Sequence, residues 1–398
     1  MPQRRARLVL STPDGAVVGC LPPFPVDVPW RQEVESVVRA AHEHHGIEVT
    51  ILRLLEASPD QGPGGEVTYL AEIAKPVPAQ IRPGKIEAHP LRQAYAEPGG
   101  PAADLAWAQR VLAGHGLAPT GKPVQIRSWN LSSVWRIPVG RQSAWLKVVP
   151  PFLAHEARII TALAGRHVPT LLGHDEHGRA LLAEIPGDDM YEASLSQLLG
   201  MVTLLVGIQA SWIGRVEELR AMRLPDWRGS SLSGAIADVV RRTSQELSGD
   251  EQASLQGFLD GLAARFAALQ ACGLPDTLVH GDCHPGNFRG TGQQFTLLDW
   301  GDSGIGHPLL DQSAFLEVVP PHHAEAVRGH WNGEWLARVP GCDPARAADL
   351  LAPIATARRA VIYQMFLDNI EPSERIYHRG DPADWLRQTA ALVRNRVE

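Results

Sequence analysis

Asp282, Asn287 and Asp299 have the side-chain types that phosphoryl transfer requires, and they follow one another at short spacings. Asp282 and Asn287 both lie in LVHGDCHPGNF, residues 278–288, and Asp299 ends the apolar run FTLLD, residues 295–299. Phosphoryl transfer needs a carboxylate that orients the attacking hydroxyl and accepts its proton, and oxygen ligands that hold Mg²⁺ on the nucleotide phosphates. Asp282 is the candidate for the first role, and Asn287 and Asp299 are the candidates for the second.

Each of these residues taken alone is also typical of a turn, because Asp and Asn beside Gly and Pro commonly stabilise turns. Their order and spacing favour a shared site instead. The pattern Asp-x-x-x-x-Asn matches the catalytic loop of protein kinases, and Asp299 stands where the metal-binding Asp of those kinases follows. Here Gly281 replaces the Arg of that loop, and Asp-Trp-Gly replaces Asp-Phe-Gly.

The segments HGDCHPGNF and LLDWGDSGIGHPLLD closely resemble the motifs of the aminoglycoside phosphotransferase and choline kinase-like superfamily, which read HGDLHPGN and then a strand ending in Asp-Trp. The resemblance covers roughly residues 105–398 and is specific for the superfamily, not for a substrate. It implies an α+β, protein-kinase-like fold with two lobes, and a small-molecule kinase that uses ATP or GTP with Mg²⁺. It also implies that His280 hydrogen-bonds within the loop and is not the base. We expect Asp311 to support the loop or to cap the next helix.

A kinase of this type also needs a cation on the nucleotide phosphates and an acid that orients this cation. Lys147 lies in the apolar strand AWLKVV, where a buried ammonium requires a partner, and Glu156 begins the next predicted helix. We therefore pair Lys147 with Glu156, as the strand Lys and the helix Glu pair in kinases. The alternatives are an edge-strand Lys147 that reaches water and a Glu156 that serves only the helix dipole.

The nucleotide-binding positions carry a weaker signal. Ser132 and Ser133, in WNLSS between two strands, offer backbone and hydroxyl donors to phosphate where protein kinases have GxGxxG, although a plain hairpin turn explains the same residues. Glu184 and Ile185, in LLAEIPGD, lie where the resembling family has the hinge between its lobes. Their backbone groups are the predicted contacts to adenine.

The resemblance places the acceptor against the helical lobe, facing the catalytic carboxylate. Asp302, Asp226 and Glu371 are acidic candidates for binding its cationic groups, and Asp302 is the strongest because it lies three positions after Asp299. The same residues are also consistent with solvated acids on helix surfaces. The predicted acceptor is a hydroxylated, amine-bearing molecule: an amino sugar, an aminoglycoside-like antibiotic or an amino alcohol.

The segment SVVRAAHEHHGIEVTILRLLE near the N-terminus resembles a degraded Nudix motif. Aligned on Gly46, the chain keeps Arg39 and Glu43, whereas Ala40 and His44 replace two glutamates. Because the lost oxygen ligands are those that bind hard cations, we predict a Nudix-like fold without Nudix hydrolysis. Such a domain would cap the kinase cleft or mediate formation of a homodimer.

The composition narrows the class of protein. The 398 residues carry a formal net charge of −7 and a pI near 6.1, which argues against a nucleic-acid binder because phosphate neutralisation needs a basic surface. No apolar stretch approaches the roughly 20 residues that span a bilayer. The N-terminus lacks a signal-peptide pattern, and the four cysteines form no CxxC pair. These features predict a cytoplasmic protein that binds neither nucleic acid nor a membrane.

Segments rich in Pro and Gly between residues 75 and 105 mark the main boundary along the chain. We predict a small α+β domain over residues 1–100, a β-rich kinase-like lobe over 105–190 and a helical lobe with the catalytic and metal loops over 191–398. The predicted strands are Ala6–Leu10, Ala16–Leu21, Val49–Leu55, Val67–Ile73, Gln125–Trp129, Val134–Val139, Ala144–Val149 and Ala180–Ile185. The predicted helices are Arg31–His44, Asp104–Ala113, His155–Leu163, Leu195–Trp212, Ser233–Leu247, Glu251–Ala271, Ala345–Asn369 and Trp385–Val397.

Two other classes of function stay open at this point. One is a non-catalytic nucleotide-binding regulator, and the other is a Nudix-type hydrolase that acts through the N-terminal domain. The intact set Asp282, Asn287 and Asp299 argues against the regulator, and the missing glutamates argue against the hydrolase.

Overall fold

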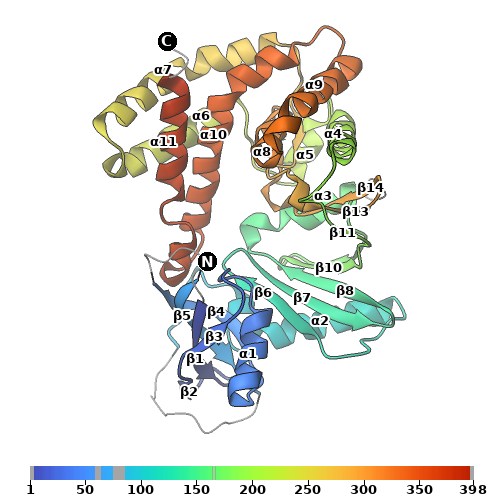
Figure 1. Ribbon diagram of the computed structural model, residues 1–398, viewed down its shortest axis with the longest axis vertical. Helices are drawn as coiled ribbons and strands as arrows, with labels where there is room; N and C mark the ends of the chain where they lie inside the picture. Colours follow the sequence, from blue (N-terminus) through green and yellow to red (C-terminus); the bar gives the residue numbers. More distant parts are fainter. Residues whose placement is uncertain (1–3, 59–63, 75–85, 164, 166, 395–398) are drawn as a thin grey trace. The chain divides into compact units, whose positions relative to one another are not determined.

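The computed structural model describes residues 4–58, 64–74, 86–163, 165 and 167–394 (Figure 1). The chain divides into two compact units, which we call the sheet unit and the helical unit. The sheet unit comprises Met1–Ala154, Leu171–Glu184 and Phe366–Arg379, and the helical unit comprises His155–Thr170, Ile185–Met365 and Gly380–Glu398. Most of the predicted 1–100 domain and of the predicted 105–190 lobe therefore lies in one unit, and the predicted boundary between them stays a prediction.

The sheet unit begins with a five-stranded mixed sheet of order β2-β1-β5-β4, with β3 also paired to β1. The strands β1 and β5 run parallel, and the other pairs are antiparallel. Apolar side chains of this sheet and of helix α1 form one buried core, against which Ile376 and Tyr377 also pack. The elements are β1 (Arg4–Ser11), β2 (Val17–Cys20), β3 (Phe24–Val26), α1 (Glu35–His45), β4 (Thr50–Ala57) and β5 (Gly65–Glu72).

The helix α1 begins at Glu35, so the prediction that it begins at Arg31 was wrong. Backbone pairing with the neighbouring strand explains the difference. The Val34 N–H donates to the Ile126 carbonyl, and Glu33 forms an isolated β-bridge with Arg127. The Glu33 carboxylate also binds the Arg127 guanidinium at 2.6 Å. A chain held in this pairing cannot also be helical.

A second antiparallel sheet in this unit has the order β6-β7-β8-β10-β9. Helix α2 buries Ala108 and Leu112 in the core of this sheet, together with Trp135, Leu146 and Leu181. The β8 strand pairs with β7 on one side and with β10 on the other, so it is a central strand. The elements are α2 (Gly100–Gly114), β6 (Val124–Trp129), β7 (Ser132–Val139), β8 (Gln142–Val148), β9 (Leu171–His174) and β10 (Arg179–Ala183).

The helical unit surrounds two small β structures: a ribbon of β12 with β15, and a sheet of order β11-β13-β14. Within it α4 packs on α9, and α7 packs on α6 and α11. The helices are α3 (His155–Ala162), α4 (Leu195–Ala210), α5 (Val216–Ala221), α6 (Gly229–Thr243), α7 (Gly249–Ala271), α8 (Leu310–Val318), α9 (Pro321–Arg338), α10 (Pro344–Asp368) and α11 (Asp381–Arg394). The strands are β11 (Asp188–Asp189), β12 (Thr277–Val279), β13 (Phe288–Thr291), β14 (Gln294–Leu297) and β15 (Gly304–Gly306).

Short 3₁₀ turns complete the chain: η1 (Ala94–Ala96), η2 (Pro151–Leu153), η3 (Ser244–Glu246), η4 (Pro285–Asn287), η5 (Trp300–Asp302) and η6 (Pro372–Tyr377). The predicted helix end at Val397 lies outside the described residues. Within the described residues, no helix combines the length and the apolar character that a membrane span requires. The four cysteines are free thiols.

Candidate active site

The loop after β12 carries the first predicted site residues, and His280 organises its backbone. The Asp282 N–H donates to His280 Nδ1 (3.3 Å), and His280 Nε2 lies 2.7 Å from the Leu298 carbonyl oxygen. Because Nδ1 accepts, the ring proton is on Nε2, which donates to Leu298. Burial lowers the pKa of His280, in agreement with a neutral ring. The prediction that His280 is a hydrogen-bonding residue of the loop is confirmed.

Asp311, in the first turn of α8, binds the backbone of the same loop. Its carboxylate accepts hydrogen bonds from the backbone N–H groups of His280 (2.8 Å) and Gly281 (2.7 Å) and from the Gln209 side chain (2.8 Å). Asp311 is fully buried, and burial raises its pKa, whereas these backbone hydrogen bonds act in the opposite direction. The predicted support of the loop by Asp311 is confirmed.

Gly281 replaces the Arg of the protein-kinase loop for a steric reason. Its φ is +93°, and a Cβ here would lie 2.0 Å from the Asp302 carbonyl oxygen and 2.8 Å from an Arg358 guanidinium nitrogen. That buried guanidinium donates to the Gly281 carbonyl at 3.3 and 3.4 Å and lies over the Trp227 ring. Only glycine combines this backbone conformation with this close approach.

Asp282 and Asn287 are brought together as predicted from their spacing. The Asn287 side-chain nitrogen donates to the Asp282 carbonyl oxygen (2.8 Å) and lies 3.3 Å from Asp282 Oδ2. The Asp282 side chain is 45% exposed, so the carboxylate is open to an incoming substrate. Because the amide nitrogen of Asn287 is used in these bonds, its oxygen is the atom left for a metal ion.

His284 is a further residue of this loop, and no role was predicted for it. Its Nδ1 accepts the Gly286 N–H (3.1 Å), which leaves the ring proton on Nε2, 3.6 Å from Asp282 Oδ2. The ring also stacks on Tyr191, with centroids 5.9 Å apart. The motif HGDCHPGN contained the signal, since a second histidine stands two positions after the candidate base.

Asp299 adopts a left-handed backbone conformation, with φ 59° and ψ 62°, at the start of η5. Such a conformation is costly for a residue with a side chain and is concentrated at functional sites. The Leu298 N–H donates to the Asn287 carbonyl oxygen (2.8 Å), which places Asn287 beside the residue that precedes Asp299. The two predicted metal ligands are therefore neighbours in the helical unit.

An amide oxygen and a carboxylate are hard ligands that suit Mg²⁺. Among the described residues, no three His, Cys, Asp or Glu side chains gather into a closed metal site. Two protein ligands suffice where the phosphates of the nucleotide complete the coordination, as in kinases. The donor set of Asn287 and Asp299 therefore fits a nucleotide-bound Mg²⁺.

Lys147 lies on β8, where it pairs in register with Val134 on β7 and with Ala180 on β10. It is half-buried on a central strand, so the alternative of an edge-strand lysine was wrong. Glu156 stands in the first turn of α3 and is 4% exposed. Lys147 belongs to the sheet unit and Glu156 to the helical unit, and their pairing stays a prediction.

The hairpin β6–β7 carries Ser132 and Ser133, whose hydroxyls serve as acceptors within the fold. The indole N–H of Trp129 donates to Ser132 (3.0 Å), and that of Trp135 donates to Ser133 (3.1 Å). Asn130 at the tip is 4% exposed, and neither polar atom of its side chain has a hydrogen-bond partner among the described residues. The Asn130 side chain is therefore buried with both its donor and its acceptor unused among the described residues.

Two other predicted contacts, Glu184 and Ile185, lie where the chain passes from a segment of the sheet unit to a segment of the helical unit. The Glu184 carboxylate accepts a hydrogen bond from the Ser143 backbone N–H within the sheet unit. Its side chain is therefore used for structure, which leaves only the predicted backbone role. Ile185 is the first residue of the next segment of the helical unit, and its contact with adenine stays a prediction.

The predicted acceptor residues differ in their surroundings. Asp302, in η5, acts on Tyr363 along with other charged groups. Burial, together with the charges of Asp381, Asp282 and Asp302, raises the pKa of Tyr363 to about 12, whereas Arg359 acts in the opposite direction. Tyr363 stacks on Trp385 at an interplanar angle of 10°. The helical unit therefore gathers acidic side chains, the Arg359 guanidinium and two aromatic rings near Tyr363.

Asp226 and Glu371 are engaged in other contacts. The Asp226 carboxylate binds the Arg228 guanidinium through two hydrogen bonds of 2.8 and 2.7 Å. Glu371 is 7% exposed and belongs to the sheet unit, where it binds Arg53 at 3.3 Å and Arg92 at 2.9 Å. Both carboxylates are therefore already bound by arginines, and neither residue is part of the proposed acceptor site.

A family model described as a phosphotransferase enzyme family matches residues 122–348, more than half of the chain. The chain belongs to this family, and it is a small-molecule phosphotransferase. A comparison with curated protein sequences finds no match. The Nudix-like character of the N-terminal domain stays a prediction.

Solved structures share the kinase-like fold at low sequence identity. The choline kinase of Streptococcus pneumoniae is 12% identical, with a TM-score of 0.52 over 74% of this chain and 99% of that one. A choline/ethanolamine kinase family protein from Mesorhizobium loti is 18% identical (TM-score 0.52, 73% and 94% covered). A macrolide 2′-phosphotransferase type I is 16% identical (TM-score 0.52, 73% and 97% covered). The predicted two-lobed, protein-kinase-like α+β fold is confirmed.

Proposed function

We propose that this protein transfers the γ-phosphoryl group of ATP or GTP to a hydroxyl of a small, amine-bearing acceptor, with Mg²⁺ as cofactor. The observation that carries the proposal is the arrangement of the loop after β12. There Asn287 binds Asp282, and the left-handed Asp299 lies next to the residue paired with Asn287.

Each residue has a defined part in this proposal. Asp282 orients the acceptor hydroxyl and accepts its proton at a carboxylate oxygen. Asn287 Oδ1 and the Asp299 carboxylate would hold Mg²⁺, which neutralises charge on the phosphates when bound. On the sheet unit, Lys147 and the β6–β7 hairpin with Ser132, Ser133 and Asn130 would bind the phosphates. The backbone at Glu184 and Ile185 would bind the nucleobase.

The charge around the catalytic loop supports a cationic acceptor. Asp381, Asp282 and Asp302 all raise the pKa of Tyr363, and Arg359 opposes them, so three carboxylates and one guanidinium act on this side chain. Tyr363 stacks on Trp385, and the Trp385 ring already packs against the Arg359 guanidinium, 4.4 Å from the ring centroid. Amino alcohols, amino sugars and aminoglycosides combine a hydroxyl with a cationic group, and choline, named for one solved relative, is an amino alcohol.

The test is Mg²⁺-dependent nucleotide consumption, measured separately with ATP and with GTP. The acceptors are supplied as pools of amino alcohols, amino sugars, aminoglycosides and neutral sugars, and Asp282→Asn is the control. We expect turnover in one of the cationic pools and a loss of about 10²–10⁴-fold in the variant. Turnover that is confined to neutral sugars would contradict the acceptor class. Equal rates in the variant would contradict the role of Asp282.

A further inference from the structure

The helical unit contains a cavity of about 620 Å³ at the end of the β12–β15 ribbon that is remote from the catalytic loop. In the antiparallel register, Thr277 pairs with Gly306 and Val279 pairs with Gly304. Asp276 and His307 therefore flank one end of the ribbon, and Asp282 follows the other end. Three strand residues, at about 3.3 Å each, separate Asp276 from the catalytic loop by roughly 10 Å.

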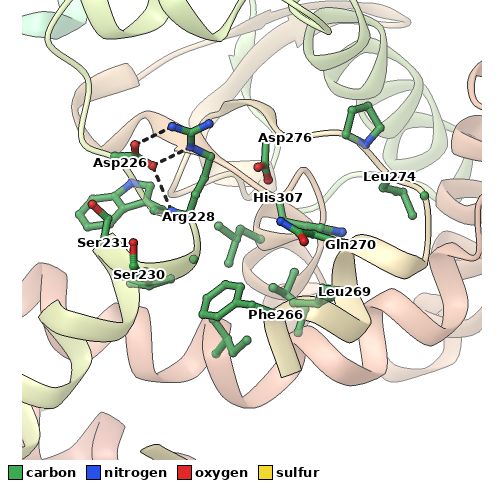
Figure 2. A pocket seen from close by; sticks show the side chains of 18 of the residues that line it. Asp226, Arg228, Ser230, Ser231, Phe266, Leu269, Gln270, Leu274, Asp276 and His307 are labelled. Atoms are coloured by element: carbon green, nitrogen blue, oxygen red, sulfur yellow. Dashed lines mark hydrogen bonds and ion pairs between the residues drawn. The ribbon is translucent and has the colours of Figure 1, made fainter. Parts of the chain in front are cut away.

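The cavity has an apolar wall and a polar side (Figure 2). Phe266 and Leu269 on α7 lie across the cavity from Asp276 and His307. Arg228 also lines the cavity, but two hydrogen bonds commit its guanidinium to Asp226. An apolar wall with a few converging polar groups is typical of small-molecule sites, which measure about 300–1,000 Å³.

His307 supplies a hydrogen-bond donor that the fold does not use. The Leu309 N–H donates to His307 Nδ1 (3.3 Å), so the ring proton is on Nε2. The residue is 8% exposed, and Nε2 has no hydrogen-bond partner among the described residues. Burial lowers the pKa of His307 to about 4, which keeps the ring neutral at neutral pH. A buried N–H without an acceptor is unfavourable, and a bound molecule that brings an acceptor would satisfy it.

Asp276 restricts which chemical group of a bound molecule can accept the hydrogen bond from His307 Nε2. It precedes Thr277 just as His307 follows Gly306, so the two residues are neighbours across the ribbon. A hydroxyl oxygen can accept from His307 Nε2 and donate its own proton to Asp276. A carboxylate in this place would face Asp276, and an ammonium group could not accept from Nε2. The Arg228 guanidinium also acts on the Asp276 carboxylate. A neutral group that carries both an acceptor and a donor satisfies both residues, and a hydroxyl is the smallest such group on an organic molecule.

We propose that this cavity binds an uncharged, hydroxyl-bearing small molecule with an apolar body. The hydroxyl lies between His307 and Asp276, and the apolar body packs on Phe266 and Leu269. The site is separate from the phosphotransfer residues and does not depend on the function proposed above.

The test uses 2-naphthol as the probe and naphthalene as its analogue without a hydroxyl, with binding followed by ligand-observed NMR. His307→Asn removes the Nε2 donor and keeps an acceptor near the Leu309 N–H. We expect it to weaken 2-naphthol about fivefold to tenfold, the effect of one hydrogen bond, and to leave naphthalene unchanged. Ser231 is exposed and lines the cavity, so Ser231→Trp blocks it and should abolish binding of both probes.

Three controls separate the site from other effects. Ala267→Trp adds the same side chain at an exposed α7 position outside the cavity and should bind both probes as the wild type does. Asp282→Asn should also bind them normally, so a failure of the proposed kinase function would not be confused with a failure of this site. Unchanged urea midpoints establish that the variants are folded. The absence of 2-naphthol binding, or binding that survives Ser231→Trp, overturns the site, and equal affinity in His307→Asn overturns the hydroxyl assignment.

Discussion

Asp311→Asn tests whether the catalytic loop depends on a buried carboxylate outside its own motif. The substitution keeps the size and shape of the side chain but turns one carboxylate oxygen into an NH₂ group. In the wild type, one oxygen accepts from His280 N–H and Gln209, and the other accepts from Gly281 N–H. An amide oxygen in the first position leaves its NH₂ group facing the Gly281 N–H, so two donors meet in a fully buried place.

The expected cost follows from these contacts. One hydrogen bond to a charged acceptor is lost, at about 1.5–3 kcal/mol, and one buried donor is left unpaired, at about 1–3 kcal/mol. Removal of a buried charge offsets part of this loss of stability, because burial by itself disfavours the ionised carboxylate and raises the pKa of Asp311. We therefore expect Asp311→Asn to lower the free energy of unfolding by about 2–4 kcal/mol. A displacement of the loop by about 1 Å would reduce kcat by about 100-fold.

The assay combines urea denaturation with turnover under the conditions of the nucleotide-consumption test. Asp238→Asn is the matched control, because this aspartate has a 47% exposed side chain and pairs with Arg241 and Arg242 on the same helix. Its loss should change stability by no more than about 0.5 kcal/mol. A urea midpoint for Asp311→Asn equal to that of the wild type would refute the reasoning from buried hydrogen bonds.

Three further predictions concern the metal, the loop and pH. Asp299→Asn should raise the Mg²⁺ concentration at half-maximal turnover by about tenfold or more, because a charged ligand is lost; an unchanged Mg²⁺ titration would exclude Asp299 as a ligand. Gly281→Ala should abolish turnover and lower the urea midpoint, since its Cβ would lie 2.0 Å from the Asp302 carbonyl oxygen; an active, equally stable variant would contradict this geometry. Burial raises the pKa of Glu374 from 4.5 to about 8, so the folded state holds this proton more tightly than the unfolded state and loses stability as pH rises through that interval. Glu374→Gln can still accept the Leu54 N–H. Urea midpoints should show nearly equal stability of variant and wild type at pH 4, below the unfolded pKa, and a more stable variant at pH 9; identical midpoints at pH 9 would count against a raised pKa.

The elements that the sequence predicted well are those with a clear apolar period or a clear ending. The end of α1 was predicted at His44 and lies at His45, where Gly46, with a φ of 66°, provides the left-handed C-cap that glycine favours. The start of α1 was predicted too early because pairing of Glu33 with Arg127 overrides helix propensity. Helix α9 was missed, since it buries only Val327, Trp331 and Trp335, a stripe of one residue in four, among polar neighbours.

The candidate site also has residues whose contacts were predictable from the sequence and residues whose contacts were not. The types and spacing of Asp282 and Asn287 were enough to predict that they meet, because they lie in one short loop. The role of Glu371 was not predictable from its type, because its partners Arg53 and Arg92 lie far away in the sequence. A carboxylate on a long-range ion pair and one on a substrate look alike in a linear sequence.

The loop after β12 explains why a motif alone does not define a phosphotransferase site. Asp282 is held by neighbours within the motif, but the backbone beneath it is held by Asp311, Gln209 and Arg358, which come from three different helices. Two of these, Gln209 and Arg358, lie outside any segment that resembles a known motif, and all three are buried. Because buried polar groups must find partners, Gln209 fixes Asp311, and Asp311 and Arg358 both bind the backbone at Gly281. The position of Asp282, the proposed base, therefore depends on several helices of the helical unit, and changes far from Asp282 in the sequence are expected to act on turnover.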